Sequence, residues 1–160
     1  MHAFEPLSYN FGTLLLTIKR AQLPNVTAHR IALADYRGAA HMRVPAPLEH
    51  SLATFADQGE QVSVDTIDGL IARGLPRPSI IKCDVEGNAP QVVSGALDLI
   101  HGHHPLWLME VWSDEEIKRM ESLGYDCFRY PVRGGTIHQV HGREGTTSTY
   151  FFLSPKPSHC

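Results

Sequence analysis

The segment from residue 80 to residue 96 constrains the fold most. In it an apolar run is followed by two acidic residues, a glycine and the expected start of a helix. The run at residues 79–85 predicts a short buried strand. Asp84 and Glu86 stand at its end, and a helix is expected to begin at Asn88. A strand that carries acids to its carboxyl end before a glycine turn is typical of ligand sites in open α/β sheets. The alternative is a surface turn whose acids only favour the helix N-terminus.

The rest of the chain alternates strands with helices, which predicts an α/β fold with a mostly parallel sheet. The expected strands cover residues 2–5, 26–33, 41–44, 62–65, 79–85, 105–111, 125–130 and 147–153, and the expected helices cover 8–22, 67–73, 89–101 and 114–122. A polar, glycine-rich stretch joins the last two strands, which indicates an antiparallel last strand. We expect one domain over residues 1–154 and a flexible tail over residues 155–160.

Composition argues against several classes of partner. A net charge of −3 and a pI near 6.3 give no basic face for a nucleic acid. No run approaches the ~20 apolar residues of a membrane span, so no membrane partner is expected. Three cysteines without a C-x-x-C pair favour free thiols in a reducing compartment, hence a cytoplasmic protein. His101, His103 and His104 fall at the amino end of the predicted sheet, and we expect no metal there.

Further short segments flank the acidic motif in a fixed order. They are Phe4-Glu5-Pro6, Ile31-Ala32-Leu33-Ala34-Asp35, Val64-Asp65-Thr66-Ile67-Asp68, Ser94-Gly95-Ala96, Trp107-Leu108-Met109-Glu110 and Leu123-Gly124-Tyr125. In this order and spacing the chain resembles the FkbM family of S-adenosylmethionine (SAM)-dependent methyltransferases, from about residue 2 to about residue 130. The resemblance implies a Rossmann-like SAM-dependent methyltransferase fold, with seven strands and the last one reversed.

One part of the family pattern is missing from the sequence. In the family, a central strand and a glycine-rich turn that holds the methionine part of SAM would precede His2, and no G-x-G-x-x-G motif occurs here. Gly134-Gly135 is more typical of a hairpin turn. We therefore expect an N-terminally truncated fold without its first strand and helix. Weak SAM binding and self-association through the exposed sheet edge are expected to follow.

The resemblance also implies a set of cofactor-binding residues. Glu5, followed by Pro6, would accept the two ribose hydroxyls of SAM through its carboxylate. Ala32 and Leu33 would line the adenine, and Asp84 would lie under the methyl group. The alternatives are a solvated acid at a strand end for Glu5 and ordinary strand core for Ala32 and Leu33.

Three acids are expected to carry the chemistry. Asp84, Glu86 and Glu110 would stand at the same sheet edge and act on a hydroxyl as a general base or an orienting group. The same carboxylates could hold a divalent cation such as Mg²⁺, although the sequence gives no separate support for a metal. The family usually has a further acid three residues after the glutamate, and Ala89 stands there in this chain.

Three functions stay open at this point. The first is SAM-dependent O-methyl transfer to a hydroxyl of a sugar, a polyketide or another small metabolite. The second is a non-catalytic methyltransferase remnant that serves as an interaction domain. The third is another α/β nucleotide-binding enzyme, such as an oxidoreductase, which the missing dinucleotide glycine motif argues against.

Overall fold

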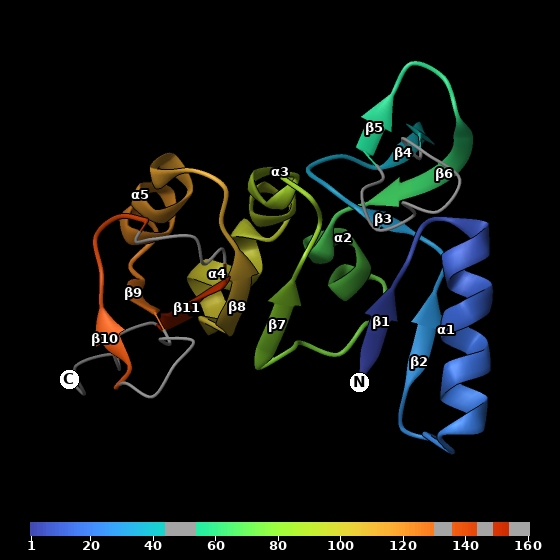
Figure 1. Ribbon diagram of the computed structural model, residues 1–160, viewed down its shortest axis with the longest axis horizontal. Helices are drawn as coiled ribbons and strands as arrows, with labels where there is room; N and C mark the ends of the chain where they lie inside the picture. The colour runs from blue at the N-terminus through green and yellow to red at the C-terminus, as the bar shows by residue number, and fades with distance from the viewer. Residues whose placement is uncertain (44–53, 130–135, 144–148, 154–160) are drawn as a thin grey trace.

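The strands form three separate sheets in the computed structural model, which describes residues 1–43, 54–129, 136–143 and 149–153 (Figure 1). The sheet orders are β1-β2, β10-β9-β11-β8-β7 and β3-β6-β4-β5. The strands are β1 (His2–Phe4), β2 (Thr27–His29), β3 (Ala32–Leu33), β4 (Gly38–Arg43), β5 (Thr54–Ala56), β6 (Glu60–Asp65), β7 (Ile80–Cys83), β8 (Leu106–Glu110), β9 (Asp126–Arg129), β10 (His138–Gln139) and β11 (Thr149–Leu153). The helices are α1 (Ser8–Arg20), α2 (Ile67–Ala72), α3 (Ala89–Ser94), α4 (Leu97–His103) and α5 (Asp114–Ser122). The predicted tail at 155–160 lies outside the described residues.

The mixed α/β class is confirmed, but the expectation of a mostly parallel sheet is wrong for the described strands. Among them, three pairings are parallel and five are antiparallel. The antiparallel pairings arise because β4 runs back against both β5 and β6, and because β11 lies between β8 and β9. The antiparallel last strand is confirmed, since β11 opposes both of its neighbours.

The single strand predicted over residues 26–33 is two strands that belong to different sheets. β2 pairs with β1, and β3 pairs with β6. The chain changes partner at Arg30, whose guanidinium lies 2.7 Å from the Glu60 carboxylate at the start of β6. The alternation shifts phase there, since the larger apolar residues stand at even positions before Arg30 and at the odd positions Ile31 and Leu33 after it.

The single helix predicted over residues 89–101 is broken into α3 and α4 at Gly95. A Cβ at Gly95 would lie 2.0 Å from the Ala34 carbonyl oxygen, so only glycine allows this approach. Asp68 of α2 fixes the break, because its backbone N–H donates to the Gly95 carbonyl and its carboxylate accepts the N–H groups of Asp98 and Leu99. The Asp68 carboxylate thus satisfies the open donors at the start of α4.

Two apolar clusters stabilise the fold. The larger one lies between the five-stranded sheet and the helices, with Trp107, Tyr150 and Phe152 fully buried at its centre. The smaller one lies in the four-stranded sheet. Cys83 and Cys127 are buried free thiols, as predicted, and burial raises the pKa of each to about 12. No helix within the described part of the chain combines the length and the apolar character that a bilayer crossing needs.

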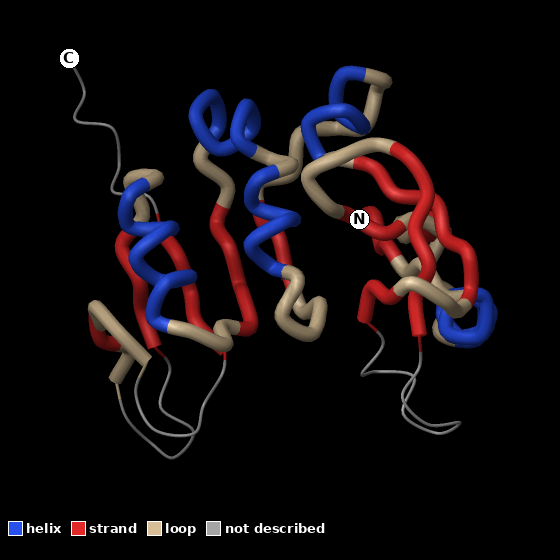
Figure 2. Tube along the Cα trace, turned by 90° about the horizontal axis from the view of Figure 1, so that it is seen from above, coloured by secondary structure: helices blue, strands red, loops and turns tan. Residues whose placement is uncertain are grey.

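Helix α1 differs from the other helices in its packing. It has no buried residue, and Tyr9, Leu15 and Leu16 are each about half exposed or more, with fractions of 66%, 47% and 56%. Figure 2 shows α1 on one side of the strands, with α2 and α4 on the other. An apolar helix surface of this kind stays in contact with water because nothing among the described residues covers it.

Two parallel strands also leave one backbone edge open. Among the described residues β1 pairs with β2 alone and β7 with β8 alone, although β1 and β7 lie side by side and point the same way (Figure 1). The Leu106 N–H donates to the Ser79 carbonyl, so the backbone groups of Ser79 face β8. Backbone groups alternate in direction along a strand, and the N–H and C=O groups of Ile80 and Lys82 therefore face the open side of β7. Ile80 is 68% exposed. Such an edge is a template for pairing with another strand.

We expect Asp68→Ala to lower the free energy of unfolding by about 1 kcal/mol, because the start of α4 loses its carboxylate acceptor. Asp98→Ala is the matched control. Asp98 lies in the first turn of the same helix, so its loss should remove only a smaller, salt-sensitive interaction with the helix dipole. Urea unfolding of both variants measures the difference, and equal losses would contradict the capping role.

We expect the open edge of β7 to cause concentration-dependent self-association. Lys82→Pro removes a backbone N–H that faces the open side, whereas Lys82→Ala keeps that N–H, and both lose the ion pair with Asp84. Sedimentation velocity should therefore find oligomers of the wild type and of Lys82→Ala, and monomers of Lys82→Pro at the same concentration. A wild-type chain that stays monomeric would refute this expectation.

Candidate functional site

The parallel pairing of β7 with β8 brings two acids together. Cys83 is in register with Met109, so the next residues, Asp84 and Glu110, stand side by side where the two strands end. In parallel strands all carboxyl ends meet at the same sheet edge. The alternation of β8 buries Met109 and leaves Glu110 half-buried at that edge.

A backbone turn places the third acid. The strand ends at Cys83, and Glu86 and Gly87 then take left-handed conformations with φ of 46° and 82°. This conformation is uncommon for a residue other than glycine. The Asn88 N–H closes the turn on the Val85 carbonyl at 3.1 Å, and α3 begins directly afterwards. The sequence predicts a strand over residues 79–85, and the observed strand is shorter because the chain leaves the sheet at Asp84.

The turn nevertheless brings all three predicted acids to one place. Asp84, Glu86 and Glu110 each offer a carboxylate oxygen, and these oxygens lie within 4.8 Å of one another. We call this group the acid cluster. Carboxylate oxygens at such spacing suit two kinds of chemistry, which are proton transfer and the binding of a hard cation such as Mg²⁺.

The surroundings shift the pKa values of two of these acids in opposite directions. A hydrogen bond from the Lys82 ammonium, with 2.7 Å between Nζ and Oδ2, holds the pKa of Asp84 below its usual value. Burial raises the pKa of Glu86, and the nearby charges of Glu110 and Asp84 raise it further. Asp84 therefore stays ionised, while Glu86 binds a proton more readily. Opposite shifts in neighbouring acids are a frequent mark of acid–base sites.

Glu5 stands just past the end of β1, as predicted. Its Oε1 accepts the Leu7 N–H at 2.9 Å, which holds the half-buried carboxylate at the start of α1. Pro6 lies between them and is also partly buried. β1 and β7 point the same way in Figure 1, and Glu5 and Asp84 are the residues that directly follow these two strands, so both stand at carboxyl ends that face the same direction. Whether Glu5 binds a ribose stays a prediction.

Ala32 and Leu33 form β3 and differ in their surroundings. Ala32 is 5% exposed and belongs to the core of the four-stranded sheet. Leu33 is partly buried and packs against the larger core. Ala32 therefore contributes to packing. Of the two residues predicted to line the adenine, Leu33 alone is exposed enough to contact a ligand.

A buried acid near the cluster, Glu116, was not among the predicted site residues. Glu116 is 8% exposed, and its Oε2 accepts the Trp112 N–H at 2.8 Å. Burial raises the pKa of Glu116, and the charge of Glu110 adds to the effect. The signal was present as Ser113-x-x-Glu116, a helix-capping pattern. Glu116 fixes the start of α5 and so the turn that follows Glu110.

Comparison with solved structures finds a similar fold. No protein-family model matches the sequence, and no curated protein matches it either. The structure is similar to the crystal structure of methyltransferase FkbM from Methylobacillus flagellatus KT, with a TM-score of 0.62 and 18% sequence identity. The similarity covers 95% of this chain and 36% of the solved chain. The fold of this chain is thus similar to that of one part of an FkbM methyltransferase.

We expect Glu110→Gln to lower the pKa of Glu86 toward its usual value, because one of the two neighbouring negative charges is lost. Lys82→Met should in contrast raise the pKa of Asp84, since its main hydrogen-bond donor is removed. Carboxyl carbon chemical shifts followed by NMR against pH measure both values. An unchanged pKa of Glu86 in Glu110→Gln would show that the two acids do not interact.

Proposed function

We propose that this chain carries the acid–base site of a SAM-dependent O-methyltransferase that acts on a hydroxyl of a small metabolite. The observation that carries the proposal is the convergence of Asp84, Glu86 and Glu110 at one sheet edge. The similarity in fold to an FkbM methyltransferase supports methyl transfer as the reaction class. The buried free thiols of Cys83 and Cys127 support a reducing compartment, such as the cytoplasm.

The acid cluster would activate and orient the acceptor. SAM, when bound, supplies a methyl group on a sulfonium centre, which is transferred by in-line displacement. A hydroxyl is a poor nucleophile, so a carboxylate that accepts its proton raises its reactivity. Asp84 stays ionised and suits the orienting role, whereas the raised pKa of Glu86 suits it to take the proton. A divalent cation held by the same oxygens would be a further way to polarise the hydroxyl.

The residues present fit part of the cofactor. Glu5 offers a carboxylate fixed by the Leu7 N–H at the end of β1, which suits two ribose hydroxyls. Leu33 offers partly exposed apolar surface at the end of β3. The sequence contains no glycine-rich motif for the methionine part. We therefore propose that this chain binds SAM through its adenosine part and with low affinity.

We further propose that β1-β2 and the strands from β7 to β9 belong to one Rossmann-like sheet that lacks a strand between β1 and β7. The common direction of β1 and β7 and their open edges support this arrangement. A parallel strand inserted there would bring Glu5 and the acid cluster onto one continuous sheet edge.

Binding of SAM tests the cofactor site. We expect millimolar SAM to shift the amide NMR signals at the ends of β1 and β7, and Glu5→Gln to weaken binding by about tenfold, since a charge-assisted hydrogen bond is lost. Glu115→Gln is the matched control, because Glu115 lies on the exposed first turn of α5. The absence of any shift would favour the interaction-domain function instead. Micromolar or tighter binding would contradict the low affinity.

Turnover tests the acid cluster. Methyl transfer from radiolabelled SAM to small hydroxylated acceptors should fall about 10²–10⁴-fold in Asp84→Ala, the usual contribution of a positioned acid–base group. Glu115→Ala should keep the wild-type rate. Equal rates in the two variants would remove Asp84 from the site.

A further inference from the structure

Two histidine rings meet on one face of the two-stranded sheet. His2 begins β1 and His29 ends β2, and 2.9 Å separates Nδ1 of His2 from Nε2 of His29. Phe4 is in register with His29, so alternation along the two strands places His2, Phe4 and His29 on the same face. The hydrogen bond between the two rings is exposed to solvent, and an ion can therefore reach it.

Stacking holds the His29 ring in a fixed orientation. Its centroid lies 4.8 Å from that of the Phe4 ring, and the two ring planes differ by 16°. Burial lowers the pKa of His29, and the nearby His2 lowers it further, so the His29 ring is neutral near pH 7 and keeps a lone pair for a ligand. A ring that is already fixed loses little conformational freedom when an ion binds to it.

The separation of the two nitrogens fits adjacent positions around one metal ion. Imidazole nitrogens bind Zn²⁺ at about 2.0–2.1 Å, so two of them lie about 2.9 Å apart at a right angle and about 3.3 Å apart at a tetrahedral angle. The nitrogens of His2 and His29 already have the first of these separations. Imidazole suits Zn²⁺, Cu²⁺ and Ni²⁺, whereas Mg²⁺ and Ca²⁺ prefer oxygen ligands.

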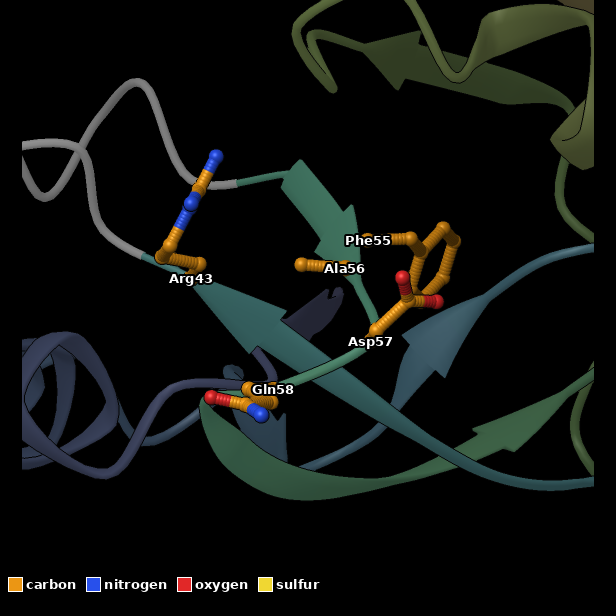
Figure 3. Close-up of a pocket in the computed structure, with 5 residues that line it drawn as sticks. All are labelled: Arg43, Phe55, Ala56, Asp57 and Gln58. Carbon is orange, nitrogen blue, oxygen red and sulfur yellow. The ribbon is translucent and has the colours of Figure 1, made fainter.

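Two other places in the described part of the chain offer different ligands. The acid cluster presents carboxylate oxygens, which suit a hard cation. The hollow beside β4 and β5 has a single carboxylate among its described lining residues, that of Asp57, which lies beside the Phe55 ring while Arg43 projects elsewhere (Figure 3). His2 and His29 thus differ from both places in chemistry, because they present ring nitrogens.

We propose that His2 and His29 bind a divalent transition-metal ion of the Zn²⁺, Cu²⁺ and Ni²⁺ class between β1 and β2. The ion takes the place of the hydrogen that the two rings share, and the donating ring carries its N–H on its other nitrogen instead. The exposed His2 ring turns toward the ion, and water fills the remaining positions. The ion therefore cross-links two strands whose histidines are 27 residues apart in the sequence.

The cross-link stabilises the strand that leads to Glu5. A sheet of two strands is marginally stable by itself, so a further link between β1 and β2 has a larger effect here than in a wider sheet. The Glu5 N–H donates to the His29 carbonyl at 3.0 Å, so the position of Glu5 depends on the same pairing. An ion that binds the folded chain alone raises its stability as the concentration of the ion rises.

The test titrates the 160-residue chain, without a polyhistidine tag, with Zn²⁺. Histidine ring ¹⁵N signals report which nitrogens bind, and we expect Nδ1 of His2 and Nε2 of His29 to shift together, with one ion per chain. His2→Gln and His29→Gln should each weaken this binding at least about tenfold, the smallest effect even of an outer-shell partner of a metal. His103→Gln changes an exposed histidine of α4 and is the matched control, which should bind like the wild type.

Each other outcome overturns the proposal. The pair is not a metal site if millimolar Zn²⁺ leaves both ring signals unchanged, if one ring shifts without the other, or if His103→Gln weakens binding as much as His2→Gln. Mg²⁺ is titrated in parallel, and equal shifts with Mg²⁺ would show an effect of ionic strength instead of coordination. The ring signals of the wild-type chain decide the question even where a variant does not fold.

Discussion

The close approach of Gly95 to the Ala34 carbonyl is the contact on which the arrangement of the molecule depends. It joins α3, which covers the five-stranded sheet, to the turn that leaves β3 in the four-stranded sheet. Asp68 holds the same point from α2, through its backbone N–H and its carboxylate. A side chain at residue 95 would push these parts away from each other, and the end of α3 would move.

Part of the acid cluster could be predicted from local sequence patterns, and part depends on tertiary structure. The apolar run at residues 80–83 predicts its strand, because alternation along a buried strand is a local property. The neighbouring position of Glu110 follows from parallel pairing, which the sequence suggests only through its alternation of strands and helices. The turn at Glu86 could not be predicted, since a left-handed glutamate contradicts the local preference of the residue.

Two predicted elements are each divided in the structure. The helix over residues 89–101 breaks at Gly95 because Asp68, far away in sequence, caps its second half. There a tertiary contact outweighs a helical periodicity that continues across the break. The strand over residues 26–33 changes sheets at Arg30, where the phase of its alternation also shifts from Val26 and Ala28 to Ile31 and Leu33.

The left-handed backbone at Glu86 has a consequence for engineering. A residue other than glycine costs about 1–2 kcal/mol in this conformation, so replacement by glycine would make the folded chain more stable. The same replacement would remove one carboxylate from the acid cluster. Selection of variants by melting temperature alone would therefore favour the loss of this acid. At residue 86, higher stability and a complete acid cluster exclude each other.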